Sequence, residues 1–262
     1  MNHQQFLKRS LFLIFSLIIF LSCSSSEDVN KEDVDDTLLP IPSTNYDITP
    51  ILIFFDNIEA VSYSVSGNTV TFTTTDLPNH TSPYWNSSHP LYEAYNGTNS
   101  NWNKNPNSIG EQNITFTMPL NPSESSIKTA TPLGPIGIAR NGVVFFNQYA
   151  GRNNQPLTNE IDSFDQWLGH PAGTQYHYHI EPSFLTNNFG KNAFLGLLSD
   201  GFPVYGPEEN GSTIISSNLD DYHGHTHETA DFPDGMYHYH VTADAPYLNG
   251  NGFFGTAGTI TR

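Results

Sequence analysis

Short apolar and alternating segments mark the first part of the chain. Residues 51–55 form an apolar run, and residues 69–75 and 113–118 alternate β-branched or aromatic residues with polar ones. Because successive side chains of a strand point to opposite faces, this period of two predicts β-strands. No segment shows the longer period of an amphipathic helix. We therefore expect a mainly β fold, either an antiparallel sandwich or a barrel-like domain.

Two later segments each have two apolar arms around an Asx-Gly pair. Asn141-Gly142 lies within residues 136–146, and Asp200-Gly201 lies within residues 195–205. Asn-Gly and Asp-Gly are strong signals for two-residue hairpin turns, in which both central residues have positive φ. The pattern predicts two β-hairpins.

The elements that follow the two predicted hairpins also recur in the same order. Asp165 and Gly169-His170 precede a first Tyr-His-Tyr-His at 176–179, and Asp220 and Gly224-His225 precede a second at 237–240. Three elements in one order favour an internal duplication of hairpin plus His-x-His strand. The pseudo-repeats would span about 131–190 and 191–250. A pseudo-two-fold axis would bring equivalent strands side by side and their histidines near one another.

The N-terminal residues differ in composition from the rest of the chain. Lys8 and Arg9 precede an apolar run at 11–21, which ends before Ser22 and Cys23. The run is too short for a comfortable membrane span and reads as a signal peptide with a lipobox. We expect residues 1–22 to be a lipoprotein signal peptide and Cys23 to be the lipid attachment residue; an uncleaved signal anchor is the alternative.

Composition indicates the domain boundaries and excludes some classes of binding partner. Residues 23–46 are rich in Ser, Asp, Glu and Pro and predict a disordered acidic tether. We assign 47–130 to an N-terminal β region that packs on the core and 131–262 to the repeat-containing domain. The formal net charge of -17 argues against nucleic acid and anionic membrane surfaces as partners.

The same features suggest where the protein acts. The predicted lipid on Cys23 would anchor it to the outer membrane of the cell envelope, and the acidic residues after Cys23 look like a signal for export to the outer surface. A periplasmic position is the alternative. Cys23 is the only cysteine, which excludes disulfides and thiolate metal sites. Neither a phosphate-binding loop nor a Gly-x-Ser-x-Gly motif is present.

The Tyr-His-Tyr-His segments predict a metal site. In a strand, the two histidines of such a segment share one face and the two tyrosines share the other. The tyrosines would face the core, and the histidines would supply two metal ligands, with a third from a Gly-His element. Imidazole ligands suit zinc, copper or nickel, and we expect copper or zinc. The candidate ligands are His170, His177, His179, His225, His238 and His240.

Other residues near these elements could support the site. The candidates for extra ligands or for residues that orient the imidazoles are Asp165, Asp200, Asp220, His223 and His227. For Asp200 a turn role alone is sufficient, and His223 and His227 could instead be merely exposed. Met236 and Gln175 precede the first histidine of each pair by two residues and could approach a metal axially. We expect His80 and His89 to be surface histidines.

At these residues the chain resembles the YHYH family of exported proteins, which is named for the tetrapeptide. The resemblance runs from about residue 132 to 255 and includes both Tyr-His-Tyr-His segments, both Gly-His pairs and the segment 200–206. Relatives often carry cysteines where this chain has Trp167 and Tyr222; if those cysteines pair, aromatic packing replaces a disulfide here. The resemblance implies an extracytoplasmic location and a shared core, but no reaction.

Three functions are compatible with the sequence. The first is an envelope-anchored lipoprotein that binds copper or zinc through the histidine cluster, in metal capture or storage. The second is a hydrolytic or oxidative metalloenzyme with an open coordination position and Asp165 or Asp220 as the base. The third is an adhesion or glycan-binding module with structural histidines, suggested by the aromatic residues Tyr84, Trp85 and Trp102.

Overall fold

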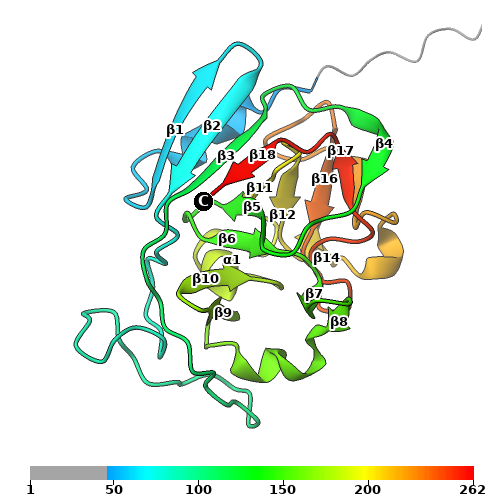
Figure 1. Cartoon of the computed structure of the whole chain (residues 1–262). Helices are drawn as coiled ribbons and strands as arrows, with labels where there is room; N and C mark the ends of the chain where they lie inside the picture. Colours follow the sequence, from blue (N-terminus) through cyan, green and yellow to red (C-terminus); the bar gives the residue numbers. More distant parts are fainter. Residues whose placement is uncertain (1–45) are drawn as a thin grey trace, which may run out of the picture. The chain divides into compact units, whose positions relative to one another are not determined.

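Both Tyr-His-Tyr-His segments lie in one eight-stranded sheet (Figure 1). The computed structural model describes residues 46–262, so the predicted signal peptide, Cys23 and nearly all of the predicted tether lie outside the described residues. The mainly β fold that the sequence predicts is confirmed. In order across the sheet, the strands are β15 (Gly224–His227), β16 (Met236–His240), β12 (Pro203–Tyr205), β11 (Phe194–Leu198), β5 (Pro135–Ala139), β6 (Val144–Phe146), β10 (Gln175–Tyr178) and β9 (Gly169–Ala172).

The strand order is symmetric about the central antiparallel pair of β5 and β11. On each side follow the hairpin partner, then the Tyr-His-Tyr-His strand parallel to it, then the Gly-His strand antiparallel at the edge. The register also matches, because His170 lies opposite His177 and His225 lies opposite His238. This is the arrangement that a repeat would produce; the duplication itself stays a prediction.

The Tyr-His-Tyr-His strands are not neighbours, as the pseudo-two-fold axis was expected to make them. Four strands, β12, β11, β5 and β6, lie between β16 and β10. The axis passes through the hairpins in the centre of the sheet, and the histidine-bearing strands are therefore placed towards its two edges.

Both predicted hairpins form, but their turns differ from the predicted type. Gly142 N donates to Ala139 O at 2.8 Å, and Ala139 N donates to Val143 O at 2.7 Å. Gly142 and Gly201 have φ values of 91° and 86°, whereas Asn141 and its counterpart Asp200 do not have positive φ. Each loop therefore has three residues and ends in a glycine with positive φ, as in a type I turn followed by a bulge.

A second sheet and three small strand pairs complete the β structure. The four-stranded sheet has the order β1 (Val61–Ser66), β2 (Thr69–Thr74), β3 (Ile114–Pro119) and β18 (Thr259–Thr261). The pairs are β17 (Phe253–Gly255) with β4 (Glu124–Thr129), β13 (Glu208–Glu209) with β14 (Ser212–Thr213), and β7 (Tyr149–Gly151) with β8 (Gln155–Pro156). The strands expected at 69–75 and 113–118 are thus confirmed within one residue.

The apolar run at 51–55 was predicted to be a strand, and this prediction is wrong. It belongs to the 3-10 helix η1 (Thr49–Phe55). Pro50 lacks the N–H that a strand ladder needs and has the φ of a first helical turn. Ile51 and Phe55 are buried while Ile53 is exposed, so the run has a helical rather than an alternating pattern of burial. The other helices are η2 (Leu157–Asn159), η3 (Ile161–Ser163), α1 (Ser183–Phe189) and η4 (Ser216–Asn218).

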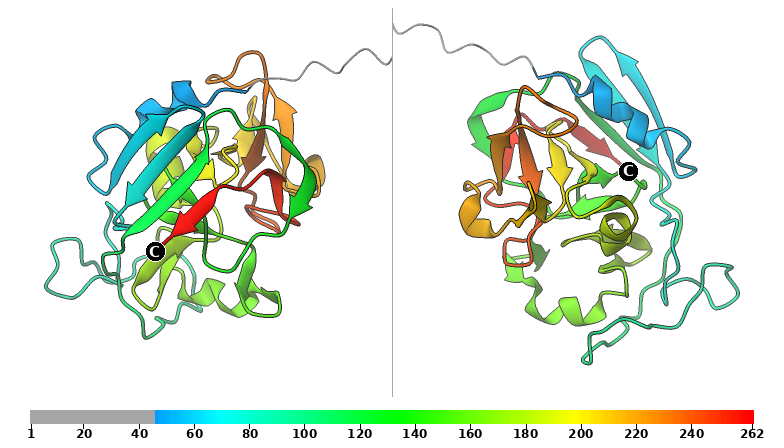
Figure 2. Two further views of the ribbon diagram at one scale, coloured as in Figure 1. Left: turned by 45° about the horizontal axis from the view of Figure 1, so that its top comes forward. Right: turned by 180° about the vertical axis from the view of Figure 1, so that it is seen from behind.

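The two sheets share one apolar core. Figure 2 shows η1 with β1 and β2, in blue and cyan, on one side of the larger sheet. Phe55 contacts both Phe72 of β2 and Phe194 of β11, with ring centroids 4.7 and 6.0 Å apart. The packing is sandwich-like, and the sheets within residues 46–262 do not close into a barrel. No helix in that range is long and apolar enough to span a membrane.

Residues 78–112 form an irregular segment that packs on the half of the sheet containing β9 and β10. Ser82 Oγ donates to Asp165 Oδ2 at 2.6 Å, and Tyr84 OH donates to Ser163 O at 2.6 Å. The segment therefore covers the fold, with Tyr84 fully buried and Trp85 7% exposed, while Tyr92 is 41% exposed.

Candidate metal centres

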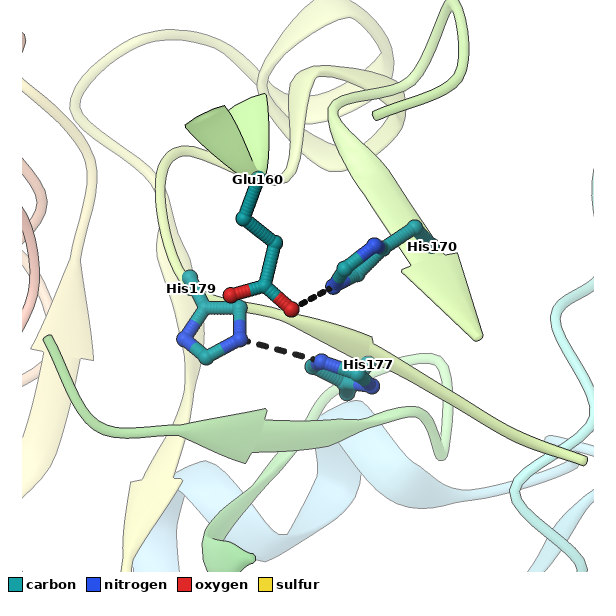
Figure 3. Close-up of side chains that lie close together, drawn as sticks. All are labelled: Glu160, His170, His177 and His179. Atoms are coloured by element: carbon teal, nitrogen blue, oxygen red, sulfur yellow. Dashed lines mark hydrogen bonds and ion pairs between the residues drawn. The ribbon is translucent and has the colours of Figure 1, made fainter. Parts of the chain in front are cut away.

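The first cluster consists of Glu160, His170, His177 and His179. His177 lies in β10, His179 follows the last residue of β10, and His170 lies in the neighbouring edge strand β9, while the glutamate lies between η2 and η3. Their ligand atoms lie within 4.8 Å of one another and point to a common centre (Figure 3). Nε2 of His177 and Nε2 of His179 are 3.0 Å apart, and His170 Nε2 lies 3.3 Å from Glu160 Oε1.

Backbone carbonyls fix the tautomers of His177 and His179. His177 Nδ1 lies 3.1 Å from Gln175 O, and His179 Nδ1 lies 2.5 Å from Asn147 O. A carbonyl oxygen only accepts hydrogen bonds, so both Nδ1 atoms carry the proton. Each Nε2 therefore keeps its lone pair and directs it into the cluster.

A hydroxyl fixes His170 in the same way. Its Nδ1 lies 2.7 Å from Ser163 Oγ, and the Ser163 hydroxyl donates to Glu160 O at 2.7 Å. Since the hydroxyl hydrogen is directed at Glu160 O, Ser163 Oγ is placed to accept from His170 Nδ1, and this contact is shorter than the 3.3 Å contact of Asn105 Nδ2 with the same nitrogen. A histidine with one nitrogen held by an acceptor and the other left unprotonated is arranged as metal-ligating histidines are.

The geometry at the centre of the first cluster could hold a cation. Three lone pairs and a carboxylate face one another, and both His170 Nε2 and Glu160 Oε2 are buried and make no hydrogen bond. Each buried polar atom without a partner costs about 1–3 kcal/mol. Two nitrogens bound to a tetrahedral zinc ion lie about 3.3 Å apart, given Zn–N bonds of about 2.0–2.1 Å. The 3.0 Å separation within the cluster is close to that value.

The second cluster consists of Glu209, His225, His238 and His240, from β13, β15 and β16. Nε2 of His225 lies 3.2 Å from Nε2 of both His238 and His240, which are 3.1 Å from each other. Glu209 Oε1 lies 3.3 Å from His238 Nε2, is buried and makes no hydrogen bond. The same four donor groups therefore converge in the second half of the sheet.

The tautomers of the second cluster follow the same rule. His238 Nδ1 lies 2.8 Å from Met236 O, and His240 Nδ1 lies 2.7 Å from Gly206 O. The residue two positions before the first histidine, Met236 here and Gln175 in β10, thus contributes its backbone carbonyl to the imidazole.

Burial disfavours the charged form of five of the six histidines. Loss of solvation is the main cause, and it lowers the pKa of His179 and His240 to about 4 and that of His238 to about 3. The pKa of His177 falls well below its usual value, and that of His225 is also lowered. Neutral imidazoles can take up a metal ion without first losing a proton.

The first tyrosine of each Tyr-His-Tyr-His segment is held on the opposite, core-facing side of its strand. Tyr176 OH donates to Asp165 Oδ2 at 2.8 Å, and Tyr237 OH donates to Asp220 Oδ1 at 3.0 Å. All four phenolic rings are buried. The prediction that the tyrosines enter the core and the histidines face away from it is therefore confirmed.

The second tyrosine of each segment contacts the hairpin loop of its own half. Asn141 Nδ2 donates to Tyr178 OH at 3.2 Å, and Tyr239 OH donates to Asp200 Oδ2 at 2.6 Å. The Asx residue of each hairpin therefore has a second role besides the turn, because it fixes the strand that carries the histidines.

The six predicted histidines form two clusters rather than one. Each half of the sheet supplies three of them, so the histidines of the two halves do not lie near one another as the pseudo-two-fold axis predicted. Glu160 and Glu209 were missed from the sequence. They lie outside the repeated elements, on a helical turn and on a short strand pair, and no spacing pointed to them.

The aspartates proposed as extra ligands do not belong to either cluster. Asp165, Asp200 and Asp220 accept hydrogen bonds from the tyrosines and from backbone N–H groups. Because the tyrosines lie on the opposite strand face, Asp165 and Asp220 are also not placed to act as a base at the clusters. The observed contacts of the three aspartates are those of turn residues and of acceptors for the tyrosine hydroxyls.

The remaining histidines have separate positions. His223 is buried and lies 2.9 Å from Thr242 Oγ1, whereas His227 lies beside the second cluster, with Nδ1 3.3 Å from Glu209 Oε1. His80, expected at the surface, is only 3% exposed, and its Nε2 lies 3.0 Å from Tyr178 OH. His89 is half-buried and stacks on Trp85 with 4.0 Å between ring centroids.

Each cluster borders a cleft. Glu160 and His170 line a cleft of about 640 Å³ whose other walls include asparagines of residues 101–107. Glu209 and His240 line a cleft of about 660 Å³ with aromatic residues and Arg140 in its wall. A small molecule could therefore approach either centre from solvent.

The comparisons with known proteins identify the family of the sheet region. A family model described as YHYH protein matches residues 115–213 and 208–252, which include all eight residues of the two clusters. No curated protein and no solved structure matches the chain.

Proposed function

The chain belongs to the YHYH protein family, and we propose that it binds two transition-metal ions, one in each histidine cluster. The observation that carries this proposal is the convergence of three imidazole Nε2 atoms on one partly buried carboxylate in each half of the sheet. Without a cation, such an arrangement places one negative charge against nitrogen lone pairs in a poorly solvated site.

We propose zinc or copper as the metal. Three imidazoles and one carboxylate suit these ions, whereas magnesium and calcium prefer oxygen ligands. Zinc accepts tetrahedral sites of this composition, and copper binds nitrogen and oxygen donors tightly. The separations of 3.0–3.2 Å between Nε2 atoms support either ion.

The proposed setting is the cell envelope. The pattern of Lys8, Arg9, the apolar run and Cys23 supports export and lipid attachment, and family membership is compatible with it. A lipoprotein anchored in the outer membrane with two buried metal centres would serve in metal capture or storage.

Metal analysis of the natural protein tests the proposal. The full-length chain is expressed without an affinity tag, recovered from the detergent-solubilised membrane fraction, and loaded with zinc or copper. We expect two ions per chain. His177→Ala and His238→Ala should each retain one ion, because each removes one buried ligand from a different cluster, and the double variant should retain none.

His89→Ala is the matched control, since His89 belongs to neither cluster and should leave two ions bound. A wild-type protein that takes up neither metal would sink the proposal, as would a double variant that keeps both ions. Recovery in the soluble fraction alone would contradict the lipid anchor without affecting the metal sites.

A metalloenzyme is the second candidate, and the cleft beside the second cluster favours it. His225 is 24% exposed, and two residues of the cluster line the cleft. An ion there could keep a position open for water or O₂, as catalytic sites do. Of the three aromatic residues that suggested an adhesion module, Tyr84 and Trp85 are buried, whereas Trp102 is partly exposed and stacks on Tyr95.

A further inference from the structure

The cleft beside the second cluster is lined by more than the candidate metal ligands. Its lining includes Glu209 and His240 of the cluster and also the aromatic residues Phe54 and Phe189 and the basic residue Arg140. Phe189 is 48% exposed. A volume of about 660 Å³ is in the range of small-molecule sites, which combine apolar walls with a few polar groups.

Arg140 lies against aromatic rings, and the Asp231 carboxylate acts on its charge from beyond ion-pair distance. Its guanidinium carbon lies 3.6 Å from the ring centroid of Phe189 and 4.6 Å from that of Phe54. Across residues 46–262, no carboxylate oxygen lies within salt-bridge distance of this side chain. Stacking uses the faces of the guanidinium, while the N–H groups in its plane stay available for a planar oxyanion.

The guanidinium distinguishes this cleft from the other one. Arg140 lies in the β5–β6 hairpin loop and reaches the cleft of the second half, whereas Ser199 occupies the corresponding place in the β11–β12 loop and is buried. The cleft beside the first cluster has asparagines and Lys104 in its lining. The Lys104 ammonium already donates to Pro83 O at 2.5 Å.

We propose that the cleft beside the second cluster binds a small organic carboxylate with an apolar or aromatic body. The carboxylate pairs with the in-plane N–H groups of Arg140, and the body lies against Phe54 and Phe189 next to the second metal centre. Planar, two-point pairing of arginine with a carboxylate is among the stronger polar contacts in proteins. The presence of a metal ion beside the ligand rests on the proposed function, whereas the binding of the carboxylate by Arg140 does not.

Acidic residues in the lining limit the charge of the ligand. Asp231 accepts a hydrogen bond from Tyr205 OH at 2.7 Å, while Glu208 is half-buried and Glu228 is exposed. Their negative charge repels a second anionic group on the ligand. The cleft therefore favours a monocarboxylate over a phosphate or a dicarboxylate.

Fluorine NMR of a simple probe tests the inference. 4-Fluorobenzoate is titrated against zinc-loaded full-length protein, and its line width reports binding. We expect saturable binding that Arg140→Gln weakens at least tenfold, because a charge-assisted contact is lost. Arg140→Lys keeps the charge without the planar fork and should give an intermediate affinity.

Lys128→Gln is the matched control. Lys128 also stacks on an aromatic ring, with its Nζ 4.1 Å from the centroid of Phe254, but it does not line this cleft. Its loss should leave the affinity for 4-fluorobenzoate unchanged. Circular dichroism and zinc content establish that each variant is folded.

The result that overturns the inference is equal binding of 4-fluorobenzoate by wild type and Arg140→Gln, or no binding by the wild type. Tighter binding of 4-fluorobenzylamine than of the benzoate also overturns it, because the acidic residues would then select the ligand. Zinc analysis of the same samples separates the two proposals. Protein with two ions and no benzoate binding refutes this inference alone, and Arg140-dependent binding by metal-free protein upholds it while the metal proposal fails.

Discussion

The glycine before the edge-strand histidine is required by the tyrosine on the next strand. A Cβ atom on Gly169 would lie 2.5 Å from Tyr176 OH, and one on Gly224 would lie 2.4 Å from Tyr237 OH. Each hydroxyl is fixed by a carboxylate, so the ring cannot move aside without losing that hydrogen bond. The Gly-His pair thus results from close packing on one face and ligand geometry on the other.

Gly169→Ala should therefore destabilise the protein. We expect a loss of about 1–3 kcal/mol in the free energy of unfolding, typical of overpacking in a core, measured by urea denaturation of metal-free protein. Gly151→Ala is the control: its Cβ would meet no atom within 4 Å, and its φ is not positive. The control should stay within about 0.5 kcal/mol of wild type; equal stability of the two variants would contradict the packing argument.

Among the eight candidate ligands, the histidines could be predicted from the sequence and the two glutamates could not. The histidines were found because a strand alternates its faces, so His177 and His179 had to share one. Glu160 and Glu209 could not be found, since turns and short loop strands have no period. They also precede the edge histidine of their half by different intervals, 170 − 160 = 10 and 225 − 209 = 16 residues. Only the folded chain brings them to the imidazoles.

Among the elements, the irregular segment 78–112 is attached to β10 through a buried histidine. His80 Nε2 lies 3.0 Å from Tyr178 OH, and its Nδ1 lies 3.0 Å from Thr81 O. Burial lowers the pKa of His80 from 6.5 to about 4. The attachment therefore depends on a neutral imidazole.

The contribution of His80 to the free energy of unfolding should therefore depend on pH. Below pH 6.5 the unfolded chain binds a proton that the folded protein does not, so the stability present above pH 6.5 is lost as the pH falls towards about 4. The full effect is about 3 kcal/mol. In urea denaturation with chelator, His80→Gln should lose about 2–3 kcal/mol less than wild type between pH 7 and pH 4.5. Parallel pH profiles for the two proteins would contradict this assignment.

Secondary-structure elements could be predicted where alternation or turn residues determined them. They could not be predicted where tertiary contacts determined them. The strands at 69–75 and 113–118 follow from alternation, and both hairpins follow from their Asx-Gly pairs. The run at 51–55 was mistaken for a strand because a short apolar run is compatible with either element. Its position between β2 and β11, with Phe55 packed on both, sets its helical burial pattern.

At the scale of the whole molecule, the sheet keeps the two clusters apart. The repeat predicted that the two Tyr-His-Tyr-His strands would be neighbours. The order of elements in the sequence does not specify, however, which strands of the two halves pair. The hairpins meet, through β5 and β11, and β10 and β16 are separated by four strands. With about 4.8 Å between neighbouring strands, five steps place them roughly 24 Å apart.

This separation predicts that the two centres stabilise the fold independently. In saturating zinc, each ion adds about 2.7 kcal/mol at a concentration 100-fold above its Kd, so His177→Ala and His238→Ala should each lower the free energy of unfolding by at least the contribution of one ion. Effects of sites this far apart usually add to within about 0.5 kcal/mol. We therefore expect the double variant to show the sum of the single effects in urea denaturation. A coupling of more than about 1 kcal/mol would mean that the halves exchange strain through the central β5–β11 pair, and the protein would then bind its two ions cooperatively rather than as two separate sites.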